Sequence, residues 1–321
     1  MLCLPIRMDK LAGLQLSILI FYYQARKCAY QTSKDLRVRV KQQRNAMING
    51  TGQYVRALML ILLCSCTVSS APNVNEVSNV PVPNRSAGCG IIQAGTGNFM
   101  RMETRVLNQV RTYYVRIPIN YDPNRAYPII FRWHGSGGNG QSGGLDIEFS
   151  SGNDAIVVGT DGLNKNWDDD TASADLLLFD RMLETIEQRY CINHDRVFSY
   201  GFSRGGYFTN HLACERGNVL RASAAVAGGL RGSHCNGKVA SWFLHDVGDA
   251  TIPIGEGKTA RDRALAMNGC TTKTIDQGEG CVRYQGCEAD PVVWCESTGF
   301  GHNIRSDFAP SRVWKFFINL P

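Results

Sequence analysis

One stretch decides the fold of this 321-residue chain, Arg196-Val-Phe-Ser-Tyr-Gly-Phe-Ser-Arg-Gly-Gly-Tyr-Phe-Thr-Asn-His-Leu-Ala-Cys214. Its first residues are β-branched or aromatic and predict a buried strand, whereas apolar side chains recur at helical spacing from 207 to 212. Between them lies Gly201-Phe-Ser-Arg-Gly205, the layout of a nucleophile elbow, in which a serine occupies a strained turn between a strand and a helix. Glycine two residues before and after this serine avoids side-chain clashes, so Ser203 is predicted to project alone.

The pentapeptide alone is a weak signal, because Gly and Ser are common enough for it to occur by chance. Its alternative interpretation is an ordinary glycine-containing turn between a strand and a helix. Suitable partner residues strengthen the catalytic interpretation, since a serine hydroxyl is a poor nucleophile until a base takes its proton, and the base needs a carboxylate that fixes its tautomer. In chains with this elbow the partners follow the serine in the order acid, then histidine.

His302 is the predicted base. It ends the segment Ser297-Thr-Gly-Phe-Gly-His302, directly beyond an apolar strand and among glycines, where a loop can place an imidazole over the edge of a sheet. The other histidines that follow the serine are predicted to be structural, namely His211, His234 and His245.

Asp249 is the predicted acid. It follows an apolar strand over residues 241–245 and leads into a turn that contains Pro253. Asp246 is the alternative, but it lies closer to the strand, where a carboxylate more often caps a turn.

Acyl transfer also needs an oxyanion hole, a pair of backbone N–H groups aimed at the carbonyl oxygen on which charge develops. The amide of Arg204 supplies one donor by its position after the serine. The segment His134-Gly-Ser-Gly-Gly138 follows a predicted strand and has the form of the glycine loop that supplies the other, which we assign to Ser136. A plain turn or a phosphate-binding loop is the alternative, but no GK[ST] follows this segment directly.

The positive charge of the chain is concentrated near its start. The whole chain carries 34 Lys+Arg and 28 Asp+Glu, a formal net charge of +6. Residues 1–66 hold 10 of these basic and 2 of these acidic side chains, which leaves 24 and 26 for the remainder, a net charge of −2. We therefore expect no nucleic-acid partner for the folded part of the chain.

An apolar run at residues 57–63 follows Arg56 and precedes the small residues Ser69-Ser-Ala71. This pattern predicts a secretory signal peptide over residues 47–71, too short for a transmembrane span. Residues 1–46 fit no signal and are interpreted as a spurious or non-structural extension.

Leu63-Cys-Ser-Cys66 also resembles a bacterial lipoprotein box, so a lipid anchor at Cys66 on the outer surface or in the periplasm is the alternative to free secretion. Residues 72–88 are rich in Asn, Ser, Val and Pro without a period and predict a linker. Residues 89–321 are enough for one large core, so we expect a single catalytic domain there, acting as a monomer.

Cysteine usage agrees with export. Eight cysteines follow the linker: Cys89, Cys191, Cys214, Cys235, Cys270, Cys281, Cys287 and Cys295. An even number suits disulfides in an oxidising compartment, although their pairing cannot be deduced from the sequence. The crowding of the last four predicts a stapled loop ahead of His302. No CxxC or HxxxH pair is present, so we predict no metal site and no cofactor.

Strand-like and helix-like segments alternate from residue 89 onward. The strand-like segments are 112–119, 127–133, 155–160, 197–200, 222–227, 241–245 and 291–296. The helix-like segments are one capped by Ser173, one that follows Ser203, residues 258–267, and a closing helix that carries Val313, Trp314 and Phe317. This alternation predicts an α/β fold with a mostly parallel sheet and helices on both faces.

Five blocks of the chain, in this order, resemble the secreted feruloyl esterases and the related polyhydroxybutyrate depolymerase-like esterases of the α/β-hydrolase fold. They are His134-Gly-Ser-Gly-Gly138, Asp161-Gly-Leu-Asn-Lys-Asn-Trp167, Gly201-Phe-Ser-Arg-Gly-Gly206, residues 245–253 and Gly301-His302. The resemblance covers nearly all of residues 89–321. It implies that Ser203, Asp249 and His302 form a triad and that Trp167 borders the active-site cleft and binds substrate, whereas a core tryptophan is the alternative from the sequence alone.

The chain departs from that family at two places. Arg204 stands where the family often has Asn or Gln, which leaves the backbone donor unchanged. Asn303-Ile304 stands where the family usually has an aromatic residue and Pro, which affects the support of the base and the shape of the acyl pocket.

The resemblance implies a secreted serine esterase that releases hydroxycinnamic acids from plant cell-wall polysaccharide through an acyl-enzyme. Polyhydroxybutyrate depolymerase-like and acetylxylan esterase activities are alternatives within the same chemistry. A serine peptidase shares the triad order, and a non-catalytic carbohydrate-binding protein on a hydrolase scaffold is an alternative of another class.

Overall fold

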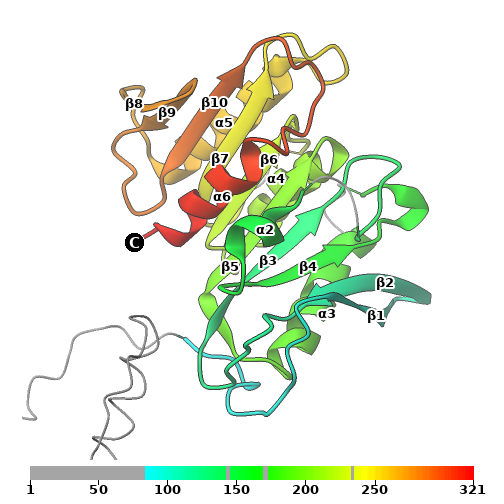
Figure 1. Ribbon diagram of the computed structural model, residues 1–321. Coiled ribbons are helices and arrows are strands. Elements are labelled where there is room, and N and C mark those ends of the chain that lie inside the picture. The colour runs from blue at the N-terminus through cyan, green and yellow to red at the C-terminus, as the bar shows by residue number, and fades with distance from the viewer. Residues whose placement is uncertain (1–83, 142–144, 169–172, 233–234) are drawn as a thin grey trace, which may run out of the picture. The chain divides into compact units, whose positions relative to one another are not determined.

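A ten-stranded sheet organises the part of the chain that the structure describes, residues 84–141, 145–168, 173–232 and 235–321 of a computed structural model (Figure 1). Its strands are β1 Phe99–Val106, β2 Gln109–Arg116, β3 Tyr127–Trp133, β4 Ile156–Thr160, β5 Ile192–Phe202, β6 Ala222–Val226, β7 Ala240–Asp246, β8 Thr274–Gly278, β9 Cys281–Tyr284 and β10 Val292–Ser297. The helices are α2 Ile147–Ser151, α3 Ala174–Glu187, α4 Arg204–Glu215, α5 Ile254–Asn268 and α6 Ala309–Ile318, with a short 3-10 helix at Leu163–Lys165.

The strand order is β1-β2-β4-β3-β5-β6-β7-β10-β9-β8. The six central strands pair in parallel, in the order β4, β3, β5, β6, β7 and β10. Strands β1 and β2 at one edge and β9 and β8 at the other pair antiparallel. Parallel strands are covered on both faces and read as continuous apolar runs, and all 7 residues of β3 are buried. The carboxyl ends of the central strands therefore meet at one edge, where loops can bring side chains together.

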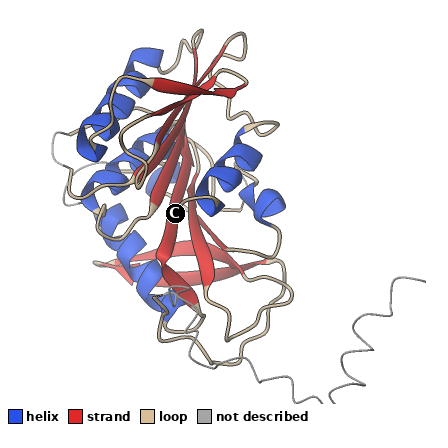
Figure 2. Cartoon of the chain, turned by 90° about the vertical axis from the view of Figure 1, so that its left-hand side faces the viewer, coloured by secondary structure: helices blue, strands red, loops and turns tan. Residues whose placement is uncertain are grey.

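Helices cover both faces of the sheet (Figure 2). Helices α3, α4 and α5 pack on one face, where Phe131, Phe179 and Phe208 belong to one apolar cluster. Helices α2 and α6 pack on the other, where Phe198 and Phe317 stack with their ring centroids 4.4 Å apart. The predicted α/β class with a mostly parallel, doubly covered sheet is confirmed.

Most element boundaries agree with the sequence within a few residues, and Ser173 caps α3 by accepting a hydrogen bond from the Leu176 amide. Strand β2 covers 109–116 rather than the predicted 112–119. Three strands and one helix were not predicted, namely β1, β8, β9 and α2. The predicted stapled loop is the β8–β9 hairpin.

The predicted linker, residues 72–88, is wrong at its end. The Ser86 hydroxyl donates to Tyr190 O (2.7 Å) and accepts from the Ile192 amide (2.8 Å), and Arg85 forms a bridge with Asn193. These bonds join the segment to the start of β5, so the folded unit begins at or before residue 84. The predicted extension 1–46, signal peptide 47–71 and anchor residue Cys66 lie outside the described residues.

All eight cysteines after the linker are paired in disulfides, which are Cys89–Cys191, Cys214–Cys235, Cys270–Cys287 and Cys281–Cys295. The last two hold the β8–β9 hairpin against its neighbours, which confirms the predicted staple ahead of His302. Across the described ranges, we find no helix with the length and apolar character that crossing a bilayer requires.

Candidate active site

The sharp turn between β5 and α4 carries Ser203. The backbone of Ser203 has φ 56° and ψ −122°, which is rare for a residue with a side chain, and its amide donates to Val226 O (2.9 Å). A Cβ added at Gly201 would collide with the Gly205 carbonyl, and one added at Gly205 would collide with the carbonyl oxygens of Trp133 and His134. Both flanking glycines are therefore required by close backbone packing, as the elbow interpretation predicts.

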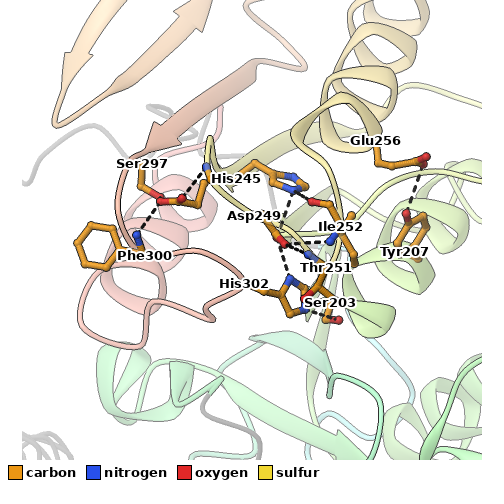
Figure 3. A network of polar contacts seen from close by, with 12 residues as sticks. Ser203, Tyr207, His245, Asp249, Thr251, Ile252, Glu256, Ser297, Phe300 and His302 are labelled. Atoms are coloured by element: carbon orange, nitrogen blue, oxygen red, sulfur yellow. Dashed lines mark hydrogen bonds and ion pairs between the residues drawn. The ribbon is translucent and has the colours of Figure 1, made fainter.

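Three predicted side chains from three loops meet at the carboxyl edge of the sheet (Figure 3). His302 Nε2 lies 2.8 Å from Ser203 Oγ, and His302 Nδ1 lies 2.7 Å from Asp249 Oδ2. An ionised carboxylate only accepts hydrogen bonds, so Nδ1 carries the proton and the Nε2 lone pair faces the serine hydroxyl. This is the arrangement in which an imidazole can take the proton of the serine.

The Asp249 carboxylate is held from several sides, and its side chain has 0% exposure. Its Oδ1 accepts the amides of Thr251 and Ile252, both at 2.9 Å. Burial raises the pKa of the Asp249 carboxyl, but the hydrogen bond from His302 and those from the two amides outweigh burial, so the pKa lies below its ordinary value. Asp249 therefore stays ionised beside the imidazole.

The alternative acid, Asp246, does not contact His302. Its carboxylate accepts from the Gly248 amide (2.8 Å), the Ser297 hydroxyl (2.9 Å) and the Phe300 amide (3.1 Å). The choice of Asp249 over Asp246 thus agrees with the contacts of both residues.

The glycine loop after β3 lies against Ser203. A Cβ added at Gly135 would lie 3.3 Å from the Ser203 Cβ. Two amides of this loop are already used, because Gly137 N donates to Lys165 O (2.9 Å) and Gly138 N donates to Gly135 O (3.0 Å). The Ser136 amide has no acceptor within the ranges that the structure describes. Arg204 begins α4 directly after Ser203, so its amide lies next to the nucleophile in the chain.

Several fungal proteins are similar to this chain. Feruloyl esterase D of Neurospora crassa is 33% identical over 262 residues, which cover 72% of this chain and 89% of the relative. The chain belongs to the feruloyl esterase family. It is therefore a carboxylic ester hydrolase, as predicted. Feruloyl esterase C of Emericella nidulans is 32% identical over 67% of this chain and 87% of the relative. No protein-family model matches the chain.

Solved structures agree on the fold of this feruloyl esterase family member. The acetyl xylan esterase from Aspergillus awamori superposes with a TM-score of 0.57 at 14% identity, covering 69% of this chain and 99% of that one. At that identity the likeness concerns architecture alone, and it confirms the predicted α/β-hydrolase fold.

Trp167 is a buried side chain in this family member, as in the alternative interpretation from the sequence, and its contact with substrate stays a prediction. Its side chain is 2% exposed. The indole N–H donates to His134 O (2.8 Å), and the ring packs edge-on against Trp133 at 5.1 Å between centroids. A buried indole needs an acceptor, and the His134 carbonyl provides one. Through this bond Trp167 holds the start of the glycine loop in place.

His134 fixes the same loop from the other side. The Gly162 amide donates to its Nε2 (3.0 Å), so its Nδ1 carries the proton and donates to Gly135 O (2.7 Å). Burial lowers the pKa of His134 and outweighs the hydrogen bond to Gly135, which raises it, so the pKa lies below its ordinary value and the neutral form is favoured.

The two departures from the family pattern have structural roles here. Arg204 Nε donates to Trp167 O (2.9 Å), which ties the elbow helix to the segment after β4. Asn303 Oδ1 accepts from the Arg305 amide (2.8 Å), and Ile304 packs on the apolar cluster under α6. These contacts hold the segment that follows His302, where the family usually has Pro.

Two supporting residues were not identified as such from the sequence. His245 was predicted only to be structural, and its Nε2 donates to Ile252 O (2.8 Å) and lies 3.5 Å from Asp249 Oδ2. Phe202 packs beside the imidazole of His302, with 5.0 Å between ring centroids. His245 could have been found from its position four residues before the acid, whereas Phe202 carries no sequence signal beyond its place in the elbow.

Proposed function

We propose that the chain is a secreted feruloyl esterase that releases hydroxycinnamic acids from plant cell-wall polysaccharide through an acyl-enzyme on Ser203. The observation that carries the catalytic assignment is the continuous chain of hydrogen bonds from Ser203 Oγ to His302 (2.8 Å) and on to Asp249 (2.7 Å). The substrate class rests on the fungal relatives named feruloyl esterase, which the chain matches over most of their length.

The acylation step follows from this geometry. Ser203 Oγ attacks the ester carbonyl carbon while its proton passes to His302 Nε2, and the resulting imidazolium is stabilised by the Asp249 carboxylate. The oxyanion is held by the amides of Ser136 and Arg204. The imidazolium then gives its proton to the departing alkoxide of the polysaccharide, which leaves the hydroxycinnamoyl group on the serine.

Deacylation repeats the sequence with water. His302 takes a proton from the water, the hydroxide attacks the acyl carbonyl, and collapse of the second tetrahedral intermediate returns the proton to Ser203 and releases the acid. These steps use only side chains and backbone amides of the chain and water, and none of them uses a cofactor.

The assignment is tested with purified protein on methyl ferulate and p-nitrophenyl acetate. Ser203→Ala removes the nucleophile, so turnover of both esters is expected to fall by at least about 10⁴-fold, the scale seen when a triad member is lost. Ser311→Ala, on the exposed start of α6, is the matched control and is expected to keep full activity. If Ser203→Ala turned over both esters at rates comparable to those of the parent protein, the proposal would be ruled out.

The substrate is tested separately. Methyl ferulate, acetylated xylan and hydroxybutyrate oligomers are compared under identical conditions, and the highest kcat/KM is expected for methyl ferulate. A preference for either of the other two would keep the catalytic assignment and replace the substrate. Turnover of casein or peptides would indicate a peptidase, and xylan binding without turnover of any ester would indicate a carbohydrate-binding protein.

Secretion is supported by the four disulfides, since disulfides persist in oxidising compartments. Expression of the full chain, followed by mass determination of the protein in the medium, tests it, with a new N-terminus near Ala71 expected. Retention on the membrane with a lipid on Cys66 would favour the anchored alternative. Gel filtration of the same protein tests whether it is a monomer.

A further inference from the structure

The acid and the base reach each other from neighbouring loops. Strand β7 leads to Asp249, and the adjacent parallel strand β10 leads to His302. The two strands are in register at their last residues, so Asp246 at the end of β7 lies opposite Ser297 at the end of β10. The distance between the acid and the base therefore depends on how the two loops are fixed to each other beyond this pair.

Asp246 is the side chain that bridges the two loops. Its Oδ1 accepts from the Gly248 amide of its own loop, and its Oδ2 accepts from the Ser297 hydroxyl and the Phe300 amide of the other loop, at 2.8, 2.9 and 3.1 Å. The residue is 4% exposed, so water competes little for these bonds. A backbone bond from Val247 N to Ser297 O (2.8 Å) runs beside them.

The loop that carries the base has little rigidity of its own. Gly299 and Gly301 flank Phe300, with φ values of 88° and 60°, and a Cβ added at either would meet no atom within 4 Å. Glycine permits many backbone conformations, so this segment needs an external contact to hold one of them. The bond from the Phe300 amide to Asp246 is such a contact, two residues before His302.

An ionised carboxylate suits this position. Burial raises the pKa of Asp246, but the donors that face it, the amides of Phe300 and Gly248 and the Ser297 hydroxyl, outweigh burial and hold the pKa below its ordinary value. Both oxygens then accept bonds, one for each loop. An asparagine at this position would present an NH₂ group to one of these sets of donors and could not satisfy both.

We infer that Asp246 is a positioning residue, which fixes the loop of His302 to the loop of Asp249 so that the imidazole reaches Asp249 and Ser203 at the same time. The inference rests on the proposed function, because it assigns Asp246 a role only through His302. Its alternative is a turn cap that contributes to stability without affecting the geometry of the base.

The first test is Asp246→Asn in the full-length protein, assayed on methyl ferulate. A displacement of reacting groups by about 1 Å costs on the order of 100-fold in rate, so kcat is expected to fall by about 10- to 100-fold, with KM within about two-fold of the parent. Asp262→Asn, which changes an exposed aspartate on α5, is the matched control and is expected to leave kcat unchanged. Titration of the serine with a stoichiometric organophosphate normalises each rate to folded sites.

A second pair of variants keeps the test independent of folding. Ser297→Ala removes one donor to Asp246 and leaves the other two, so a smaller fall in kcat is expected, while Ser297→Thr retains the hydroxyl and restores the rate. The downfield ¹H resonance of the His302 Nδ1 proton reports its bond to Asp249 and is expected to weaken or vanish in Asp246→Asn and to persist in Ser297→Thr.

The outcomes separate the two proposals. If Ser203→Ala keeps esterase activity, the proposed function fails whatever Asp246 does. If Ser203→Ala is inactive, but Asp246→Asn and Ser297→Ala keep the parental kcat and the downfield resonance while losing only thermal stability, Asp246 is a turn cap and the inference is wrong.

Discussion

At the scale of single residues, the strained backbone of Ser203 determines what its neighbours can be. Its φ of 56° turns the chain so tightly that Gly201 and Gly205 approach each other and the end of β3. The strain is maintained because the Ser203 amide is bonded to Val226 O and because α4 begins at once. The projection of the half-buried hydroxyl from the turn is thus a consequence of close packing on both sides of the serine.

Gly205→Ala is expected to damage both stability and activity. The added methyl group would overlap two carbonyl oxygens at the end of β3, and backbone atoms there cannot yield without moving the glycine loop. Overpacking of this kind costs about 1–3 kcal/mol of the free energy of unfolding. Urea unfolding and kcat on methyl ferulate measure the two effects.

Gly255→Ala in α5 is the control for that variant. A Cβ there meets nothing within 4 Å, so a gain of about 0.5–1 kcal/mol from helix propensity is expected, with kcat unchanged. If Gly205→Ala equals the parent in both measurements, close packing at the elbow is not what selects glycine.

The sequence predicted the residues of the hydrogen-bond chain better than their supports. Ser203 follows from the elbow, which is a local pattern, and Asp249 and His302 follow from the order of its partners along the chain. Trp167 could not be placed, because whether an indole faces a cleft or a carbonyl depends on packing between β3 and α4. The second contact of Asp246, with the loop after β10, likewise depends on strand order, which no short motif encodes.

At the scale of elements, the glycine loop after β3 depends on a neutral histidine. His134 accepts from the Gly162 amide at one nitrogen and donates to the Gly135 carbonyl from the other. Protonation would replace the acceptor with a second donor facing an N–H group. Burial and the N–H group of Gly162 both oppose protonation, and the pKa of His134 lies below its ordinary value.

Acidification is therefore expected to destabilise the fold through His134. An unfolded histidine titrates near pH ~6.5, whereas the folded one binds its proton only at lower pH, so this contribution is complete above pH ~6.5 and is lost as pH falls through the folded pKa. The free energy of unfolding, measured in urea between pH 7.5 and pH 5 (about one unit above and one and a half below that value), is expected to decrease.

The variant His134→Gln isolates this contribution. Its amide oxygen can accept from Gly162 and does not titrate, so the decrease with falling pH should be smaller than in the parent. An equal decrease in both proteins would assign the pH dependence to other groups.

Elements were predicted where burial imposes a pattern and missed where it does not. The strands β3, β6 and β10 are buried apolar runs and were placed within two residues. All 5 residues of β8 are exposed, and in β1 only Val106 is buried. A strand paired at a sheet edge gains its hydrogen bonds from a neighbour rather than from its own sequence, so neither edge could be recognised in advance.

At the scale of the whole molecule, the disulfides close loops of very different length. Cys89–Cys191 closes a separation of 102 residues and ties the start of the domain to the start of β5, whereas Cys281–Cys295 closes 14 residues between β9 and β10. The sequence indicated that the eight cysteines pair but could not give the pairs, since pairing depends on which strands become neighbours.

Removing the two disulfides one at a time tests how they stabilise the domain. If a cross-link acts mainly by restricting the unfolded chain, its contribution grows with the logarithm of the loop that it closes. Replacing Cys89 and Cys191 by Ala is then expected to lower the free energy of unfolding by about 1.7 kcal/mol more than replacing Cys281 and Cys295. Cys191 and Cys295 are both fully buried, so the packing lost at those sites is similar. Urea unfolding under oxidising conditions measures the difference, and an equal or reversed ranking would show that native-state contacts of the β8–β9 hairpin outweigh the restriction of the unfolded chain.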